Sequence, residues 1–217
     1  MPSLPPVDCA APNLPGGDAL LSAAGQATLR EAVEERLTNI SGVWKMRLLA
    51  RDLIAVLAPA MERVLQDAGF PVFSRRVRTV RITRGVREHG SCSFPRGSNA
   101  ECRLAFSGHL FFAGNAAVLI DIVAHELLHA CLAAREGHGA IFRQGMTRLN
   151  ESLGLHIEIH SEKTAIRQSE ALYRYKVVCS ACGNTFYYLR AGAVVKHPSR
   201  YRCAKCGKAA LEVFRRT

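Results

Sequence analysis

The chain has 217 residues, of which 48% are hydrophobic, and its formal charge is +11. A chain of this length can bury one substantial core and carry a small appendage besides. The first ten residues lack the basic and apolar segments of a secretion signal, and the most apolar stretch, residues 116–134, is interrupted by acidic and histidine residues. We therefore expect neither a secretion signal nor a membrane span.

The positive charge is concentrated near the C-terminus. From Ser161 onward there are 12 Lys and Arg against three acidic residues, so this segment holds +9 of the total. A segment this basic attracts polyanions at modest salt, nucleic acid first among them. The alternative is a solvated basic surface without a specific partner.

The N-terminal part predicts a leader and two helices. Residues 1–24 are rich in Pro, Gly and Ala and show little periodicity, which indicates a flexible leader. Apolar residues at helical spacing then predict helices over residues 26–40 and 44–67. Pro59 can kink the second of these helices.

The middle of the chain predicts a small sheet. Residues 77–83 alternate apolar and charged side chains, as in a strand with one buried face, and residues 101–107 repeat the pattern. The Gly, Ser and Pro content of residues 90–99 indicates a connecting loop.

Two helices are predicted after the strands. Asn115 is a candidate N-cap for a helix over residues 116–134, which is apolar enough to be nearly surrounded by core. A further helix is expected over residues 140–153, ended by Gly154.

The apolar helix contains the sequence His125-Glu126-Leu127-Leu128-His129. Residues four apart lie one turn above each other, so both imidazoles can bind one zinc ion while Glu126 projects beside them. Two histidines and a glutamate in a buried helix would cost about 1–3 kcal/mol per unsatisfied polar group unless they serve a function. The competing interpretation is a structural helix with hydrogen-bonded core histidines.

A catalytic zinc usually has three protein ligands and one open position. His138 follows Gly137, where the chain can turn back across the ligands, whereas Glu151 is the competing candidate one helix further along. Spacing alone leaves both open. In either case Glu126 is the expected general base, which accepts a proton from water and passes it to the leaving amine. Asp121, one turn before His125, can orient an imidazole or serve a surface or capping role.

Several segments resemble the SprT-like metallopeptidases, whose eukaryotic members are the Spartan proteases. Residues 137–142, Gly-His-Gly-Ala-Ile-Phe, resemble the family's His-Gly-x-x-Phe segment. Residues 90–93 and 102–107 resemble the two short strands before its catalytic helix, and residues 201–207 resemble the C-terminal ribbon of bacterial members. The resemblance implies that His138 is the third zinc ligand.

The resemblance covers about residues 44–210. It implies an α+β fold, with a zincin-like helical metallopeptidase core and a small antiparallel sheet, followed by a zinc ribbon. One departure is the link of eight residues between His129 and His138, which is shorter than in the Spartan proteins and affects the expected cleft wall.

Four cysteines form two Cys-x-x-Cys pairs, Cys179/Cys182 and Cys203/Cys206, separated by 20 residues. This spacing is typical of a four-cysteine zinc site, and the glycine after each pair suits a tight knuckle. A C-terminal segment with few large apolar residues needs a cross-link such as a bound metal ion in order to fold, so this zinc is expected to be structural. A disulfide framework is the alternative, but the other four cysteines are scattered, which favours metal binding in the reducing cytosol.

Aromatic residues lie among the basic residues of the tail, a composition that allows bases to stack while phosphates are neutralised. Those aromatics can equally form the small core of the ribbon. The candidate nucleic-acid contacts are Lys176, Tyr188, Arg190, Lys196, Arg200, Arg202 and Lys205.

These features predict a leader (residues 1–24), a SprT-like metallopeptidase domain (25–160) and a basic zinc-ribbon domain (161–217). The leading hypothesis is a cytoplasmic zinc endopeptidase with a catalytic and a structural zinc, and the resemblance implies action on proteins bound or crosslinked to single- or double-stranded DNA. One alternative is a nucleic-acid-binding zinc protein whose peptidase-like half is a scaffold or regulator, although the intact Glu126 argues against it. Another is a peptidase for one cellular protein.

Overall fold

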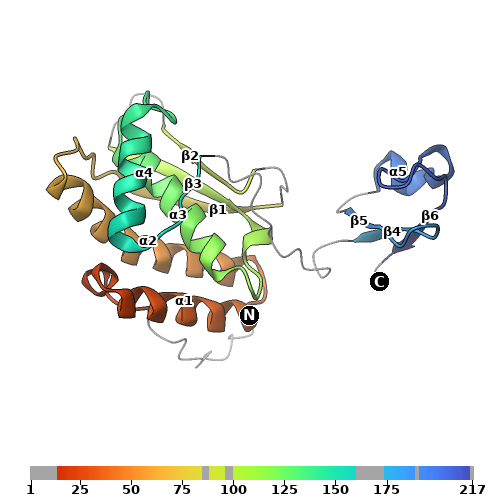
Figure 1. The fold of residues 1–217 in the computed structure, drawn as a ribbon, viewed down its shortest axis with the longest axis horizontal. Coiled ribbons are helices and arrows are strands. Elements are labelled where there is room, and N and C mark those ends of the chain that lie inside the picture. Colours follow the sequence, from red (N-terminus) through yellow and green to blue (C-terminus); the bar gives the residue numbers. More distant parts are fainter. Residues whose placement is uncertain (1–13, 85–87, 96–99, 160–173, 189–190, 216–217) are drawn as a thin grey trace, which may run out of the picture. The chain divides into compact units, whose positions relative to one another are not determined.

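The computed structural model describes residues 14–84, 88–95, 100–159, 174–188 and 191–215. The chain divides into two compact units, residues 1–167 and residues 168–217 (Figure 1). The predicted domain boundary after residue 160 lies outside the described residues.

The first unit is built around a buried helix. Its helices are α1 (Ala23–Thr38), α2 (Val43–Asp67), α3 (Ala116–Cys131) and α4 (Ala140–Leu153). Helix α3 packs against α1, α2, α4 and the sheet (Figure 1). Twelve of its 16 residues are buried, so the prediction of a helix nearly surrounded by core is confirmed.

A three-stranded sheet covers another side of α3. Its strands are β1 (Arg76–Thr83), β2 (Gly90–Ser93) and β3 (Glu101–Ser107), in the order β1-β3-β2. Strand β2 is antiparallel to β3, whereas β1 runs parallel to β3. The predicted α+β class with small antiparallel sheets is confirmed. Strand β1 departs from the antiparallel pattern, because it pairs with β3 and not with β2, the strand that follows it in the chain.

Strand β2 lies inside the segment that its Gly, Ser and Pro content predicted as a loop, so that prediction is wrong for residues 90–93, whereas the short strand that the family resemblance implied there is confirmed. The glycine that suggested a loop has a packing reason. A Cβ atom on Gly90 would lie 2.6 Å from Glu126 Oε1, too close for any side chain. Strand β2 therefore needs a glycine where it passes the Glu126 carboxylate on α3.

A side chain from α1 accepts hydrogen bonds from the backbone at the start of α3. Asn115 stands at the N-cap position, but its side chain donates instead to the His109 carbonyl at 3.1 Å. The Glu34 carboxylate on α1 accepts hydrogen bonds from the backbone N–H groups of Ala116, at 3.3 Å, and Gly114. The predicted N-cap position of Asn115 is confirmed, but the acceptor for the backbone N–H groups is a carboxylate from α1 and not the Asn115 side chain.

The end of α3 is held from the segment before β1. Arg75 Nη1 donates to the carbonyls of Ala130, at 2.6 Å, and Leu132, while the Phe73 amide donates to the Cys131 carbonyl at 2.8 Å. A cation at the C-terminal end also suits the helix dipole. Contacts at both ends therefore fix α3 in the unit.

The predicted leader is too long. A short 3₁₀ helix, η1 (Gly17–Leu21), packs against α1 and α2, and Leu20 is only 2% exposed. Its apolar burial orders residues that composition alone marked as flexible, so the prediction is wrong from Gly17 onward. Residues 1–13 lie outside the described residues.

The second unit is a small antiparallel sheet with short helical turns. Its strands are β4 (Tyr175–Cys179), β5 (Thr185–Tyr188) and β6 (Leu211–Arg215), in the order β5-β4-β6. The turns are α5 (Ala193–Lys196) and a 3₁₀ helix, η5 (Pro198–Arg200). Among its described residues, only Val177, Cys179 and Cys203 are fully buried hydrophobic residues, which is little core for an independent unit.

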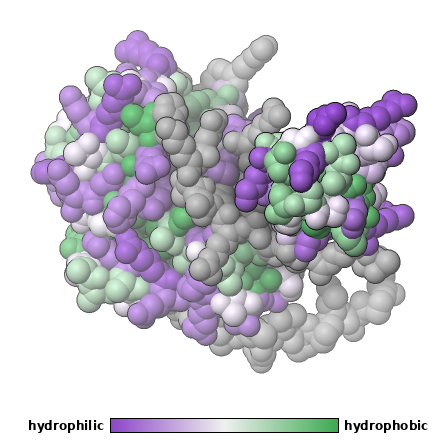
Figure 2. Space-filling model, turned by 45° about the vertical axis from the view of Figure 1, so that its right-hand side comes forward, coloured by the Kyte–Doolittle hydropathy of each residue, from purple (hydrophilic) through white to green (hydrophobic). Residues whose placement is uncertain are grey.

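Within the described part of the chain, no helix combines the length and the apolar character needed to cross a membrane. On the face drawn in Figure 2, hydrophilic residues surround small, separate hydrophobic groups.

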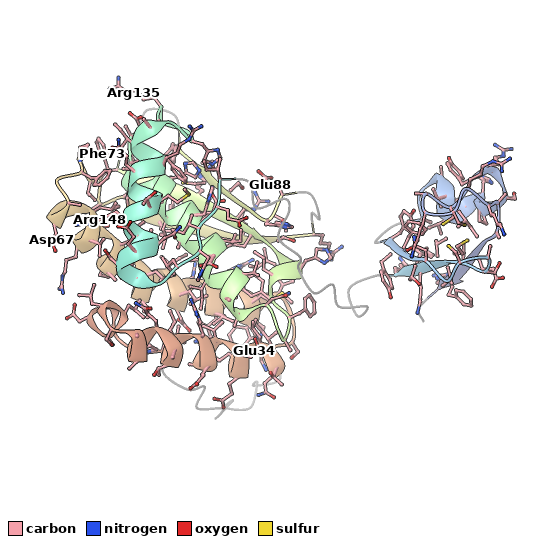
Figure 3. The ribbon with its side chains drawn as sticks, in the orientation of Figure 1. Glu34, Asp67, Phe73, Glu88, Arg135 and Arg148 are labelled. Carbon is pink, nitrogen blue, oxygen red and sulfur yellow. The ribbon has the colours of Figure 1, made fainter. Side chains whose placement is uncertain are left out.

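Removing the carboxylate that caps α3 should destabilise the first unit. Glu34 lies on α1 beside the loop that precedes α3 (Figure 3). We expect Glu34→Ala to lower the free energy of unfolding by about 1–2 kcal/mol, because two backbone N–H groups lose their acceptor. Denaturant unfolding measures the change. Glu35→Ala, at the exposed neighbouring position, is the control, and equal effects of the two changes would refute the capping role.

Candidate metal centres

Three histidines converge in the first unit. His125 and His129 come from successive turns of α3, and His138 comes from the loop between α3 and α4. The Nε2 atom of His138 lies 3.1 Å from those of His125 and His129, which lie 3.2 Å from each other. The three nitrogens therefore point at one common position.

The spacing of these nitrogens fits a shared zinc ion. Ligands at about 2.0–2.1 Å in tetrahedral geometry lie roughly 3.3 Å apart, close to the observed separations. His125 Nδ1 donates to the Glu158 carbonyl at 2.9 Å, so its Nε2 carries a lone pair and no proton. Lone pairs brought this close repel each other unless a cation lies between them.

The protonation of the histidines also suits a metal. Burial, followed by repulsion from neighbouring imidazoles, lowers the pKa of His125 to about 4 and that of His129 to about 3. Both rings are therefore neutral at physiological pH, the form that binds metal ions.

Phe142 supports all three imidazoles. Its ring, fully buried on α4, lies 4.4 Å from the His129 ring, 4.9 Å from the His138 ring and 5.1 Å from the His125 ring. A rigid aromatic surface behind the rings limits their motion and keeps the three nitrogens together. The Phe of the His-Gly-x-x-Phe segment is therefore part of the site's support.

Glu126 is 6% exposed and lies in the same cleft as the histidines, which has a volume of about 620 Å³. Burial, followed by the negative charge of Glu88, which also lines the cleft, raises the pKa of Glu126 to about 8 (Figure 3 labels Glu88). A cation at the histidines would oppose this shift by favouring the ionised carboxylate. The carboxyl group is thus poised to exchange a proton near neutral pH.

The competing third ligand lies elsewhere. Glu151 is on the exposed surface of α4, where Arg148 Nη1 lies 3.8 Å from its carboxylate (Figure 3 labels Arg148). The Asp121 Oδ1 atom accepts a hydrogen bond from the backbone amide of His156 at 2.9 Å, so this contact is with the chain after α4 and not with an imidazole. The structure therefore brings His138, and not Glu151, to the other two histidines.

The four cysteines of the second unit also converge. Cys179 Sγ lies 3.6 Å from Cys206 Sγ, Cys182 Sγ lies 3.6 Å from Cys203 Sγ, and all four sulfurs lie within 4.8 Å of one another. Tetrahedral thiolates at about 2.3 Å from zinc lie roughly 3.8 Å apart, so the arrangement fits a four-cysteine zinc site. The sulfurs are too far apart for disulfides.

Each Cys-x-x-Cys pair forms a tight turn. The amide of Gly183 donates to the Cys179 carbonyl and that of Gly207 to the Cys203 carbonyl, each at 2.8 Å. Both glycines have positive φ, 69° and 71°, which disfavours other residues. Backbone N–H groups, first that of Cys206, lower the pKa of Cys203 to about 6, which favours the thiolate that binds zinc.

The predicted nucleic-acid contacts lie in different parts of the second unit. Lys196, Arg200, Arg202 and Lys205 are exposed, and Arg202 Nη1 donates to the Gly207 carbonyl at 3.3 Å. Arg190 lies outside the described residues.

Strand register divides the aromatics between the two sheet faces. Tyr188 pairs with Tyr175 and so shares the face of the buried Val177. Lys176 pairs with Tyr187 on one side and Phe214 on the other, and its Nζ lies 6.0 Å from the Tyr187 ring centre. Phe214 was not among the predicted contacts; alternation along the strands is the signal that places it on one face with Tyr187 and apart from Tyr188.

An HExxH helix, a third histidine and a glutamate in one cleft define a candidate metallopeptidase centre. Residues 60–164 match the family model of the SprT-like family. The match includes the three histidines and Glu126, and it ends before the four cysteines. No curated protein and no solved structure matches the chain.

The two candidates for the third ligand predict opposite metal contents. We expect wild-type protein to bind two zinc ions and His138→Ala to keep only the one at the four cysteines, because two imidazoles alone hold zinc weakly. Glu151→Ala should bind two, since Glu151 lies away from the histidines. Elemental analysis of purified full-length protein measures the ratio. Loss of zinc in Glu151→Ala with retention in His138→Ala would reverse the assignment.

Proposed function

We propose that the protein is a zinc-dependent endopeptidase of the HExxH type with a zincin-like core. The observation that carries this proposal is the convergence of three imidazole nitrogens beside Glu126 in one cleft. The match of residues 60–164 to the SprT-like family supports the same reaction class.

The chain's own residues have separate roles in this reaction. His125, His129 and His138 would hold the zinc ion, which when bound supplies a Lewis acid that acidifies water and polarises the scissile carbonyl. Glu126 accepts a proton from the attacking water and donates it to the leaving amine. Burial gives Glu126 a pKa of about 8, and a nearby cation lowers this pKa toward neutrality. The same group can therefore accept the proton from water and then donate it to the leaving amine.

The cleft is suited to a polypeptide. Its lining includes residues Gly90 to Cys92 of β2, the loop that carries His138, and Ile159. A cleft of about 620 Å³ admits a few residues of an extended chain, not a folded domain. Unfolded or loosened segments are therefore the expected substrates.

The basic second unit would bring the peptidase to proteins bound or crosslinked to DNA in the cytoplasm. Its exposed Lys196, Arg200 and Lys205 offer charge for phosphates, and the sheet face of Lys176 presents Phe214, which is 51% exposed, for base stacking. A four-thiolate zinc site needs a reducing compartment to remain reduced, which favours the cytosol.

Replacing the proposed base should separate chemistry from metal binding. We expect Glu126→Gln to lower the cleavage rate of an unfolded protein such as casein by a factor of about 10²–10⁴ while both zinc ions remain bound. Cleavage is followed by gel electrophoresis, with and without single- and double-stranded DNA. Glu101→Gln, in the ion pair with Arg78 on the sheet, is the control that should retain activity. A Glu126→Gln enzyme with near-wild-type activity would exclude this mechanism.

Removing positive charge from the second unit should weaken binding to DNA. Changing Lys196, Arg200 and Lys205 together to Gln should reduce affinity for single-stranded DNA and flatten its salt dependence, by about 2 in the log–log slope if all three contact phosphates. Fluorescence anisotropy at several salt concentrations measures both quantities.

The control for this experiment removes the same charge elsewhere. Arg47, Arg51 and Arg81 are exposed in the first unit, and changing them to Gln should leave the slope unchanged. Equal effects of the two triple variants would mean that net charge alone attracts DNA, which contradicts a binding surface on the second unit.

A further inference from the structure

The segment that follows α4, residues 154–158, connects three helices to the zinc-ligand histidine His125. We call this segment the strap. It begins at Gly154, which ends α4 with a positive φ of 58°, and its Leu155 and Ile157 side chains are buried. All strap residues except the buried Leu155 form a backbone hydrogen bond to a side chain of a helix.

Asn150 holds the middle of the strap from the last turn of α4. Its Nδ2 donates to the Ile157 carbonyl at 3.1 Å, and its Oδ1 accepts from the Ile157 amide at 2.9 Å. One side chain thus satisfies both backbone groups of a buried residue, as a paired strand would. This two-point contact fixes the orientation of the peptide units on both sides of Ile157.

Asp121 holds the preceding residue from α3. Its Oδ1 accepts from the His156 amide at 2.9 Å. Asp121 lies one turn before His125, so the same helix presents the ligand and the anchor for the chain that contacts it.

Helix α1 holds the start of the strap. Arg30 Nη2 donates to the Gly154 carbonyl at 2.7 Å. Gln26 packs so closely that a Cβ atom on Gly154 would lie 2.0 Å from its Oε1. The start of the strap therefore packs directly against α1, and the hydrogen bond from Arg30 holds it there.

These contacts place the Glu158 carbonyl 2.9 Å from His125 Nδ1. A carbonyl oxygen can only accept, so His125 carries its proton on Nδ1 and presents a bare Nε2 to the metal. Such partners fix both the tautomer and the ring orientation of a ligand histidine.

We propose that Asn150 and Asp121 are positioning residues for the zinc site, which act on His125 through the strap. Asn150 fixes the orientation of the backbone at Ile157, and Asp121 fixes the distance between the strap and α3. The Glu158 carbonyl then accepts the hydrogen bond from His125 Nδ1. The proposal rests on the proposed function only in requiring zinc at the three histidines; it does not require that the protein cleave peptides.

Zinc affinity of full-length protein tests the proposal. Competition with a chromogenic chelator, under conditions in which the four-cysteine zinc stays bound, gives the affinity of the histidine site. We expect Asn150→Ala and Asp121→Ala each to weaken it by about 10-fold or more, the usual effect of losing such a partner. Asp121→Asn should restore most of the affinity, because its amide oxygen can still accept from His156.

A spectroscopic measurement separates positioning from general loosening. In metal-free protein, the His125 Nδ1–H proton should give a protected NMR resonance, and this resonance should be lost in Asn150→Ala and kept in Asp121→Asn. Glu151→Gln is the matched control, since it changes the exposed residue next to Asn150 and should keep both affinity and resonance within twofold of wild type.

Each outcome is decisive. Affinity within twofold of wild type in a folded Asn150→Ala or Asp121→Ala protein overturns the proposal, as does a loss that Asp121→Asn fails to restore. If Asn150→Ala does not fold, the two Asp121 variants alone decide. Wild-type protein that binds zinc only at the cysteines overturns the proposed function, a result distinct from failure of the strap.

Discussion

The structure depends on the burial of α3, a helix that carries polar side chains able to bind a metal ion. Helix α3 is surrounded by other elements, yet His125 and Glu126 on it are 7% and 6% exposed. Placing two such groups in a core costs free energy unless they find partners. Burial keeps the imidazoles of His125 and His129 neutral, which is the form that binds metal ions. The packing that forms the core therefore also prepares the site.

A helix with this task must be held in place, and its neighbours supply the contacts. A carboxylate from α1 caps its start, Arg75 caps its end, and Phe142 packs behind the imidazoles. Gly90 lets β2 approach the Glu126 carboxylate. Since residues from every layer of the unit contact α3, substitutions remote from the histidines can change the metal site without changing a ligand.

The second unit follows a different principle. Its sheet has little apolar core, and four cysteine sulfurs within 4.8 Å of one another take the place of that core. Two glycines with positive φ close the turns around the sulfurs. Because the second unit needs few side chains for a core, aromatic and basic residues can share one sheet face around Lys176.

The sequence by itself determined whatever depends on local spacing. It predicted the buried helix, the two helix histidines one turn apart, and the paired cysteines, because periodicity of four residues or fewer fixes those positions. Spacing left His138 and Glu151 open, the family resemblance favoured His138, and the tertiary structure brings His138 to the other two histidines. Only the tertiary structure also showed the parallel pairing of β1 with β3, the cap by Glu34 and the contacts of the strap. Each joins residues far apart in the chain, and local patterns carry no information on such contacts.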